Sequence, residues 1–160
     1  MLASERPDGD DDLLQPSVAR GGSPPLAPPY AVDSQGYVAF FGGAVGGALI
    51  GVINARRLDL GRARTAAIAA IGVAGLALSV GLGLALGDTT AEGIRIGRIV
   101  GVVLFLVGFR PLQNPAYRRY HFFDHAGRGD ASLLGPGFGA VVTGLVVEAV
   151  ALSFAQGGSG

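Results

Sequence analysis

Residues 37–53 read YVAFFGGAVGGALIGVI, an apolar run without a single charged side chain. A helix that crosses a bilayer needs roughly 20 mostly apolar residues, and this run is close to that length. Three comparable runs follow, at 65–86, 94–109 and 136–155. The sequence therefore predicts an all-α integral membrane protein, a bundle of four transmembrane helices.

The composition leaves little room for anything else. Of the 160 residues, 49% are hydrophobic, and only a short tail and three loops remain outside the four runs. The chain has no cysteine, which excludes disulfides, thiolate metal sites and cysteine nucleophiles. We expect no catalytic residue, no cofactor and no nucleic-acid partner.

The two ends of the chain have a different composition from the rest. Residues 1–36 are acidic at first and then rich in proline, without the basic and apolar regions of a signal peptide. This composition predicts a disordered tether. Pro25 and Pro28 have the PxxP spacing, so a short recognition motif is an alternative. Residues 156–160 form a glycine-rich C-terminal tail.

The arginines predict the orientation in the membrane. They gather in the first loop (54–64) and the third (110–135), whereas the second (87–93) has none. Short arginine-rich loops stay in the cytoplasm, so we expect four crossings with both chain termini outside, in a cell membrane that we take to be a bacterial plasma membrane. Arg95 and Arg98 lie near the start of the third run, where arginine can reach the headgroups.

Small residues recur every four positions on all four predicted helices. Such spacing puts them on one face, where helices in lipid approach closely. The first helix has two adjacent glycine rows, so one of them is expected to face another copy or another membrane protein; a tightly packed monomer is the alternative. The packing residues are Gly43, Gly47, Gly51, Gly75, Ser79, Gly83, Gly97, Gly101, Ala140 and Gly144.

One acidic residue lies deep in the fourth helix. Glu148 follows Ala140 and Gly144 on the same face, so we expect it to face protein. If the third and fourth helices are antiparallel neighbours, Arg98 lies at a matching depth and is the predicted partner. The pair can be a structural salt bridge or part of an ion or proton path. Alternatively, a neutral Glu148 bonds a backbone carbonyl or Ser79.

The third loop has the composition of a segment at the cytoplasmic membrane interface. Its aromatic and basic side chains alternate at Tyr117, Arg118, Arg119 and Tyr120. Pro111 and Pro115 are expected to end the third helix. The group His121, Asp124 and His125 is a weak zinc candidate, because no fourth ligand is evident.

These features favour a non-catalytic role. We expect an accessory, scaffolding or self-associating membrane component whose glycine-rich faces pack against itself or a partner. The alternative is a small transporter or channel that uses Glu148 and Arg98 in a polar path through the membrane. A membrane enzyme built on the third loop is a more distant possibility.

Overall fold

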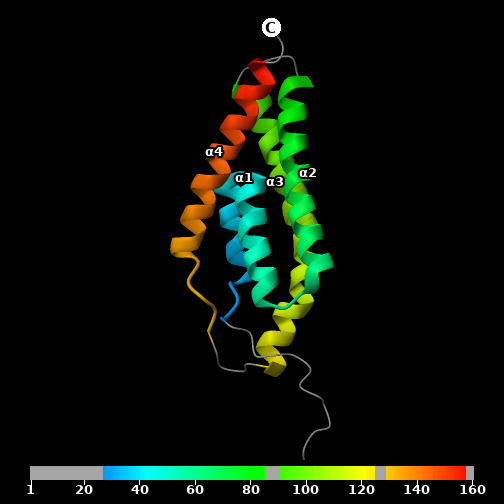
Figure 1. Cartoon of the computed structure of the whole chain (residues 1–160), viewed down its shortest axis with the longest axis vertical. Coiled ribbons are helices and arrows are strands. Elements are labelled where there is room, and N and C mark those ends of the chain that lie inside the picture. Colours follow the sequence, from blue (N-terminus) through cyan, green and yellow to red (C-terminus); the bar gives the residue numbers. More distant parts are fainter. Residues whose placement is uncertain (1–26, 86–90, 125–128, 158–160) are drawn as a thin grey trace, which may run out of the picture.

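A computed structural model describes residues 27–85, 91–124 and 129–157. Its helices are α1 (Val32–Arg57), α2 (Gly61–Ala85), α3 (Ala91–Arg119) and α4 (Leu134–Gly157), and a short π-helix, η2 (Tyr120–Asp124), continues α3. All four α-helices are long and apolar enough to span a membrane. The chain is therefore an all-α multi-pass membrane protein, as predicted (Figure 1).

The first helix is broken in the middle and folds back on itself. Gly43 has φ 69° and ψ −173°, outside the helical region, and separates half-helices at 32–42 and 44–57. In Figure 1, α1 rises from one end of the bundle, turns near mid-height and returns. Its two ends are consequently neighbours: the Tyr30 amide donates to Asn54 Oδ1 at 2.7 Å. We expected the ends of this apolar run on opposite sides of the membrane, and the structure differs.

Glycine explains why this run turns rather than continuing straight. A positive φ with ψ near 180° is open essentially to glycine alone. The residues around the turn are also small, so the two half-helices can touch closely. A Cβ added to Gly47 would lie 2.7 Å from Ala39 Cβ, within van der Waals radii. The GG pairs that suggested interfaces with other helices thus also allow α1 to pack on itself.

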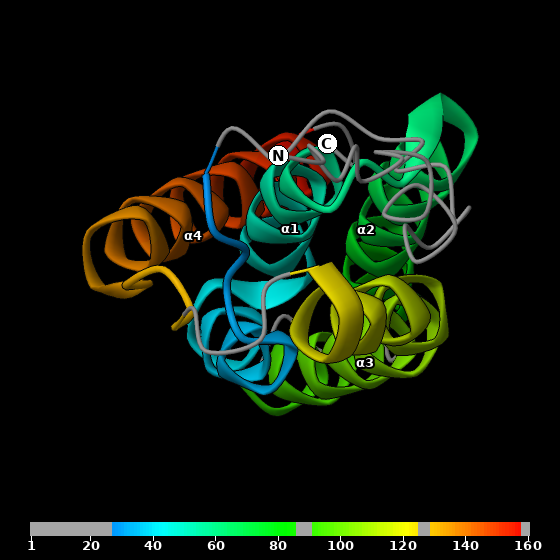
Figure 2. The ribbon, with the colours of Figure 1, turned by 90° about the horizontal axis from the view of Figure 1, so that it is seen from below.

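The folded α1 lies at the centre of the bundle. Figure 2 shows it between α4 on one side and the α2–α3 pair on the other. It packs against all three neighbours, whereas the backbones of the described parts of α3 and α4 are not close to each other. The core around α1 contains Phe105 and Phe109, whose rings stack at 4.7 Å, together with Ile50 and Ile68, all fully buried.

The third helix is longer than predicted. Pro111 and Pro115 were expected to end it, but both lie inside α3. A proline removes one backbone hydrogen bond, and in membrane helices neighbouring groups can compensate for that loss. Here the side chain of Gln113, between the two prolines, donates to the Gly51 carbonyl of α1 at 2.7 Å. This contact ties the proline-containing segment to the core.

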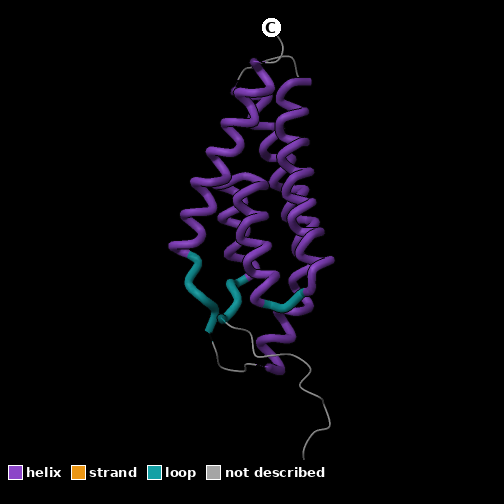
Figure 3. Tube along the Cα trace, viewed as in Figure 1, coloured by secondary structure: helices purple, strands orange, loops and turns teal. Residues whose placement is uncertain are grey.

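The described connections gather at one end of the molecule. Figure 3 shows residues 27–31, 58–60 and 129–133 as loops at the same end. A backbone bond from the Ala131 amide to the Pro29 carbonyl, at 2.9 Å, joins two of them. The C-terminal end of α4 lies at the opposite end (Figure 1). The three loops therefore define one polar end of the bundle.

Candidate functional site at the break in α1

The break in α1 exposes the ends of two half-helices inside the protein. The last carbonyls of the 32–42 half and the first amides of the 44–57 half lack the partners that a continuous helix provides. These ends also carry partial charges, negative at the carbonyl end and positive at the amide end. Gly42, Gly43 and Ala44 are buried, so water cannot freely satisfy them. The neighbouring helices must supply compensating groups.

Arg98 of α3 reaches the carbonyl end. Its guanidinium donates to the Phe41 carbonyl, and its Nε lies 3.5 Å from Glu148 Oε2. A cation at this position stabilises the negative end of the half-helix. The arginine thus satisfies an orphan carbonyl and pairs with a carboxylate at the same point.

Glu148 of α4 lies beside Gly43, at the break itself. Glu148 as a whole residue is 8% exposed. Its Oε2 would lie 3.1 Å from a Cβ added to Gly43. The carboxylate therefore fills the space that the missing side chain leaves. Gly144, one turn earlier, has no room for a Cβ because the Gly42 carbonyl occupies that position. Glycine on both helices is what allows the carboxylate to reach the break.

The ion pair lies about one half-helix away from the polar end of the bundle. A half-helix over 32–42 is about 16 Å long at 1.5 Å per residue, and the hydrocarbon core is about 30 Å thick. If the polar end of the bundle lies at one membrane surface, the break is close to mid-depth. Charged side chains at this depth are costly and generally face protein or a water-filled cavity.

A second polar group, the amide cluster, consists of Gln35, Asn54 and Gln113, all fully buried. Gln113 Oε1 accepts from Asn54 Nδ2 at 2.9 Å and from Gln35 Nε2 at 3.2 Å. Asn54 also accepts from the Tyr30 amide and donates to the Tyr30 carbonyl. Among the described side chains, Gln35 Oε1 is a buried acceptor without a partner. The cluster holds the two ends of α1 together and to α3.

The sequence paired Arg98 with Glu148, and the structure brings them together, but for a different reason. The pairing assumed that α3 and α4 are direct neighbours, whereas α1 lies between them. The two side chains meet across the tip of the folded helix. Ser79, the other partner considered for Glu148, instead lies 2.9 Å from the Gly75 carbonyl and 3.0 Å from the Gly97 carbonyl.

Sequence reasoning missed the break at Gly43 and the amide cluster. Gly43 had been placed on a continuous helical row with Gly47 and Gly51, but it is not helical. A usable signal was present: Gln35 and Asn54 flank the first apolar run, where two buried amides need partners. Their pairing through one side chain from α3 requires the run to fold back.

The predicted small-residue faces are in contact inside the molecule. A Cβ added to Gly47 would contact Phe105, and one added to Gly51 would contact Ile68. A Cβ added to Gly75 would contact Ala44, and one added to Gly97 or Gly101 would contact Ser79. Ala140 packs with the core around Tyr30 and Ile50, and Gly83 is buried. The described glycine rows thus already have partners within one copy of the chain.

The third-loop candidates lie at the polar end. Tyr117 donates to Asp130 at 2.7 Å, and His121 Nε2 lies 3.0 Å from the same carboxylate. Arg118 and Arg119 are exposed in the last turn of α3, whereas Tyr120 is buried. The Asp124 side chain and His125 lie outside what the structure describes. Within its described residues, no group of three or more His, Cys, Asp or Glu could hold a metal ion.

The break in α1, with its ion pair, is the strongest candidate site that the geometry provides. Comparisons of the chain with protein-family models, curated proteins and solved structures give no match.

Proposed function

We propose that this protein is a small transporter or channel for ions, with the broken helix and the Arg98–Glu148 pair as its polar element. The observation that supports this most is the position of the pair. It lies at the tip of a folded-back helix, between the carbonyl of Phe41 and the backbone of Gly43. In membranes, irregular backbone is tolerated where it is buried in protein or lines a cavity, and broken helices commonly form ion sites.

The arrangement suggests how an ion could be handled. Arg98 compensates the negative end of one half-helix, and Glu148 lies beside Gly43, the residue between the two half-helices. A proton or cation could compete with Arg98 for Glu148, and an anion could compete with Glu148 for Arg98. The Arg98 side chain is 31% exposed and that of Glu148 only 10%, so Arg98 is the partner that the protein covers less.

A flux measurement tests this proposal. The purified chain would be reconstituted in liposomes, and the movement of H⁺, Na⁺, K⁺ and Cl⁻ followed with ion-sensitive dyes. The informative variant is Arg98→Gln combined with Glu148→Gln, because removing Arg98 alone leaves the buried Glu148 carboxylate without its ion-pair partner and destabilises the fold. A matched control is Asp33→Asn, which breaks the exposed pair with Arg110, at 3.1 Å.

We expect wild type and Asp33→Asn to conduct one of these ions, and the double variant to lose at least tenfold in flux while remaining folded. If wild type conducts none of the four, or the folded double variant conducts as well as wild type, the proposal is wrong.

A second candidate is the accessory or self-associating role. Three aromatic side chains on the 32–42 half-helix are largely exposed: Tyr37 at 70%, Phe40 at 66% and Phe41 at 58%. Phe41 is also the residue whose carbonyl accepts from Arg98, so a partner covering this face would also cover the partly exposed arginine. Purification from the native membrane in mild detergent tests this role: a stoichiometric second protein would favour it over transport.

We further propose that the polar end of the bundle faces the cytoplasm of a bacterial cell. Loop 58–60, flanked by Arg56, Arg57 and Arg62, lies at this end with the described residues before α1. The positive-inside rule then puts the N-terminal side of α1 inside and the end of α4 outside. This replaces our expectation that both termini are outside, since the folded α1 returns to the side on which it began.

Cysteine labelling tests the orientation, because the chain has no cysteine of its own. A membrane-impermeant maleimide applied to intact cells should label Gly157→Cys but label Ala27→Cys and Ala63→Cys only after permeabilisation. Equal labelling of Ala27→Cys and Gly157→Cys in intact cells would contradict this topology.

A further inference from the structure

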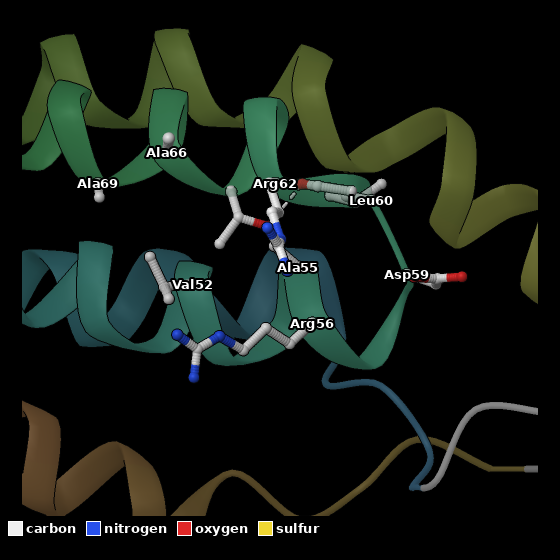
Figure 4. Close-up of a pocket in the computed structure, with 10 residues that line it drawn as sticks. Val52, Ala55, Arg56, Asp59, Leu60, Arg62, Ala66 and Ala69 are labelled. Carbon is white, nitrogen blue, oxygen red and sulfur yellow. Dashed lines mark hydrogen bonds between the residues drawn. The ribbon is translucent and has the colours of Figure 1, made fainter.

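A groove of about 620 Å³ opens between α1 and α2 at the polar end (Figure 4). Its lining combines two arginines with small apolar side chains: Val52, Ala55, Arg56, Asp59, Leu60, Gly61, Arg62, Thr65, Ala66 and Ala69. The groove lies on the outside of the bundle, away from the ion pair at the break. It is therefore a separate feature from the candidate transport site.

Within the part of the chain that the structure describes, the two arginines of the groove have no side-chain partner. Among the described residues, neither Arg56 nor Arg62 forms an ion pair or a side-chain hydrogen bond. Both arginines line the groove, Arg56 from α1 and Arg62 from α2. In Figure 4, Arg62 lies between the two helices, and the Arg56 side chain extends along α1. Asp59, the acidic residue of the turn, points away from them. Among the described residues, the positive charge of the rim is therefore not paired.

The adjacent Arg57 differs from the two arginines of the groove, because its side chain contacts other parts of the protein. Its guanidinium donates to the Pro28 carbonyl at 2.7 Å and lies 4.1 Å above the Tyr30 ring. Arg57 thus fastens the start of α1 to its end. The arginines of the groove make no such contact, so the fold itself does not account for them.

The rest of the groove is apolar. Val52 and Ala55 of α1 and Ala66 and Ala69 of α2 line it. Ala66 and Ala69 are exposed, whereas Ala55 is fully buried. From the arginines, this surface continues along the helices toward the middle of the membrane. A flexible alkyl chain can cover it, whereas a free anion would contact only the rim.

We propose that this groove binds one anionic phospholipid of the surrounding bilayer. Arg56 and Arg62 would hold the phosphate of the headgroup, and the apolar surface of Val52, Ala66 and Ala69 would contact an acyl chain. The charge complementarity and the position at the arginine-rich membrane surface support this occupant, because basic pockets between helices on the cytoplasmic side recognise acidic headgroups. The proposal does not depend on whether the protein transports ions.

The test is lipid binding to the full chain in a neutral detergent. Native mass spectrometry would measure stoichiometry and affinity for phosphatidylglycerol, with phosphatidylcholine and inorganic phosphate as the other probes. We expect one tightly bound phosphatidylglycerol. Each arginine near a membrane surface contributes about 1 kcal/mol, which is about fivefold in affinity, so Arg56→Gln with Arg62→Gln should weaken binding about 25-fold.

Matched variants separate this groove from general surface charge. Arg64→Gln removes an exposed arginine of the same helix that does not line the groove, and should leave the affinity unchanged. Ala69→Leu fills the groove without changing charge and should weaken binding, whereas Ala70→Leu, an exposed neighbour outside it, should not.

Three results would overturn the proposal. One is an unchanged affinity in the double arginine variant. Another is an equal loss with Arg64→Gln, which would indicate unspecific attraction of acidic lipid. The third is displacement of phosphatidylglycerol by millimolar inorganic phosphate, which would make this a site for a free anion and not for a lipid.

Discussion

Replacing Gly43 by alanine distinguishes a broken α1 from a continuous one, because the two structures predict opposite signs. In a continuous helix, Gly→Ala at an interior position stabilises the fold by about 1 kcal/mol. In the structure, Gly43 has φ 69° and ψ −173°, a conformation that other residues adopt only at a cost of about 1–3 kcal/mol. The two cases therefore differ by roughly 2–4 kcal/mol in the free energy of unfolding.

The surroundings of Gly43 add to the expected loss. The new methyl group would lie 3.1 Å from Glu148 Oε2 and 3.7 Å from its carboxyl carbon. The carboxylate would have to move, and its distance of 3.5 Å to Arg98 Nε would change with it. We therefore expect Gly43→Ala to lower the free energy of unfolding by about 2–3 kcal/mol, the upper half of the 1–3 kcal/mol that the backbone conformation costs.

Reversible unfolding in mixed micelles, followed by circular dichroism, measures this free energy. Gly36→Ala is the matched control: Gly36 lies in the 32–42 half-helix, and its added Cβ would make only an ordinary contact, 3.8 Å from Leu106. We expect Gly36→Ala to be neutral or up to about 1 kcal/mol more stable than wild type. If Gly43→Ala is as stable as Gly36→Ala, or more stable than wild type, α1 is not broken at Gly43 and the reasoning fails.

Three further predictions concern the folded helix and its packing. Spin labels at Tyr37 and Ile53 would be about 24 Å apart along a continuous helix, whereas packed half-helices have axes only about 10 Å apart. A distance measurement by pulsed electron spin resonance should give the shorter value. A single long distance would exclude the fold-back. Asn54→Leu should lower the free energy of unfolding by about 1–3 kcal/mol or more, because buried partners are left unpaired, while Asn114→Leu, outside the amide cluster, should cost clearly less. Gly47→Leu should prevent folding, because its Cβ already lies 2.6 Å from Phe105; a folded variant with a smaller oligomer in light scattering would show instead that this row faces another copy.

The candidate site was partly predictable. The sequence indicated that Glu148 needs a partner and that Arg98 is a suitable one, because lone charges are costly inside a membrane. It did not indicate where they meet. That depends on Gly43, whose unusual backbone cannot be told from a helical glycine in a chain with 28 glycines.

The assignment of the glycine rows shows a second limit. Spacing of four residues predicts a close approach, but not which helix approaches. Gly42 faces α4, whereas Gly47 faces Phe105 of α3 and the preceding half of its own helix. Which helix packs against a given glycine depends on the packing of all side chains in the bundle. The sequence of one helix therefore does not predict it.

The sequence by itself determined that the chain is helical and resides in a membrane, because length and hydropathy of a segment are local properties. Only the tertiary structure decided that α1 turns back at Gly43, that α1 separates α3 from α4, and that Arg98 and Glu148 meet at its tip. The physical reason is that an apolar run with glycine pairs is compatible with both a straight and a folded helix. The balance is set by groups distant in the sequence. Gln113 joins Gln35 to Asn54 at the ends of α1. At the turn, Arg98 donates to the Phe41 carbonyl and pairs with Glu148.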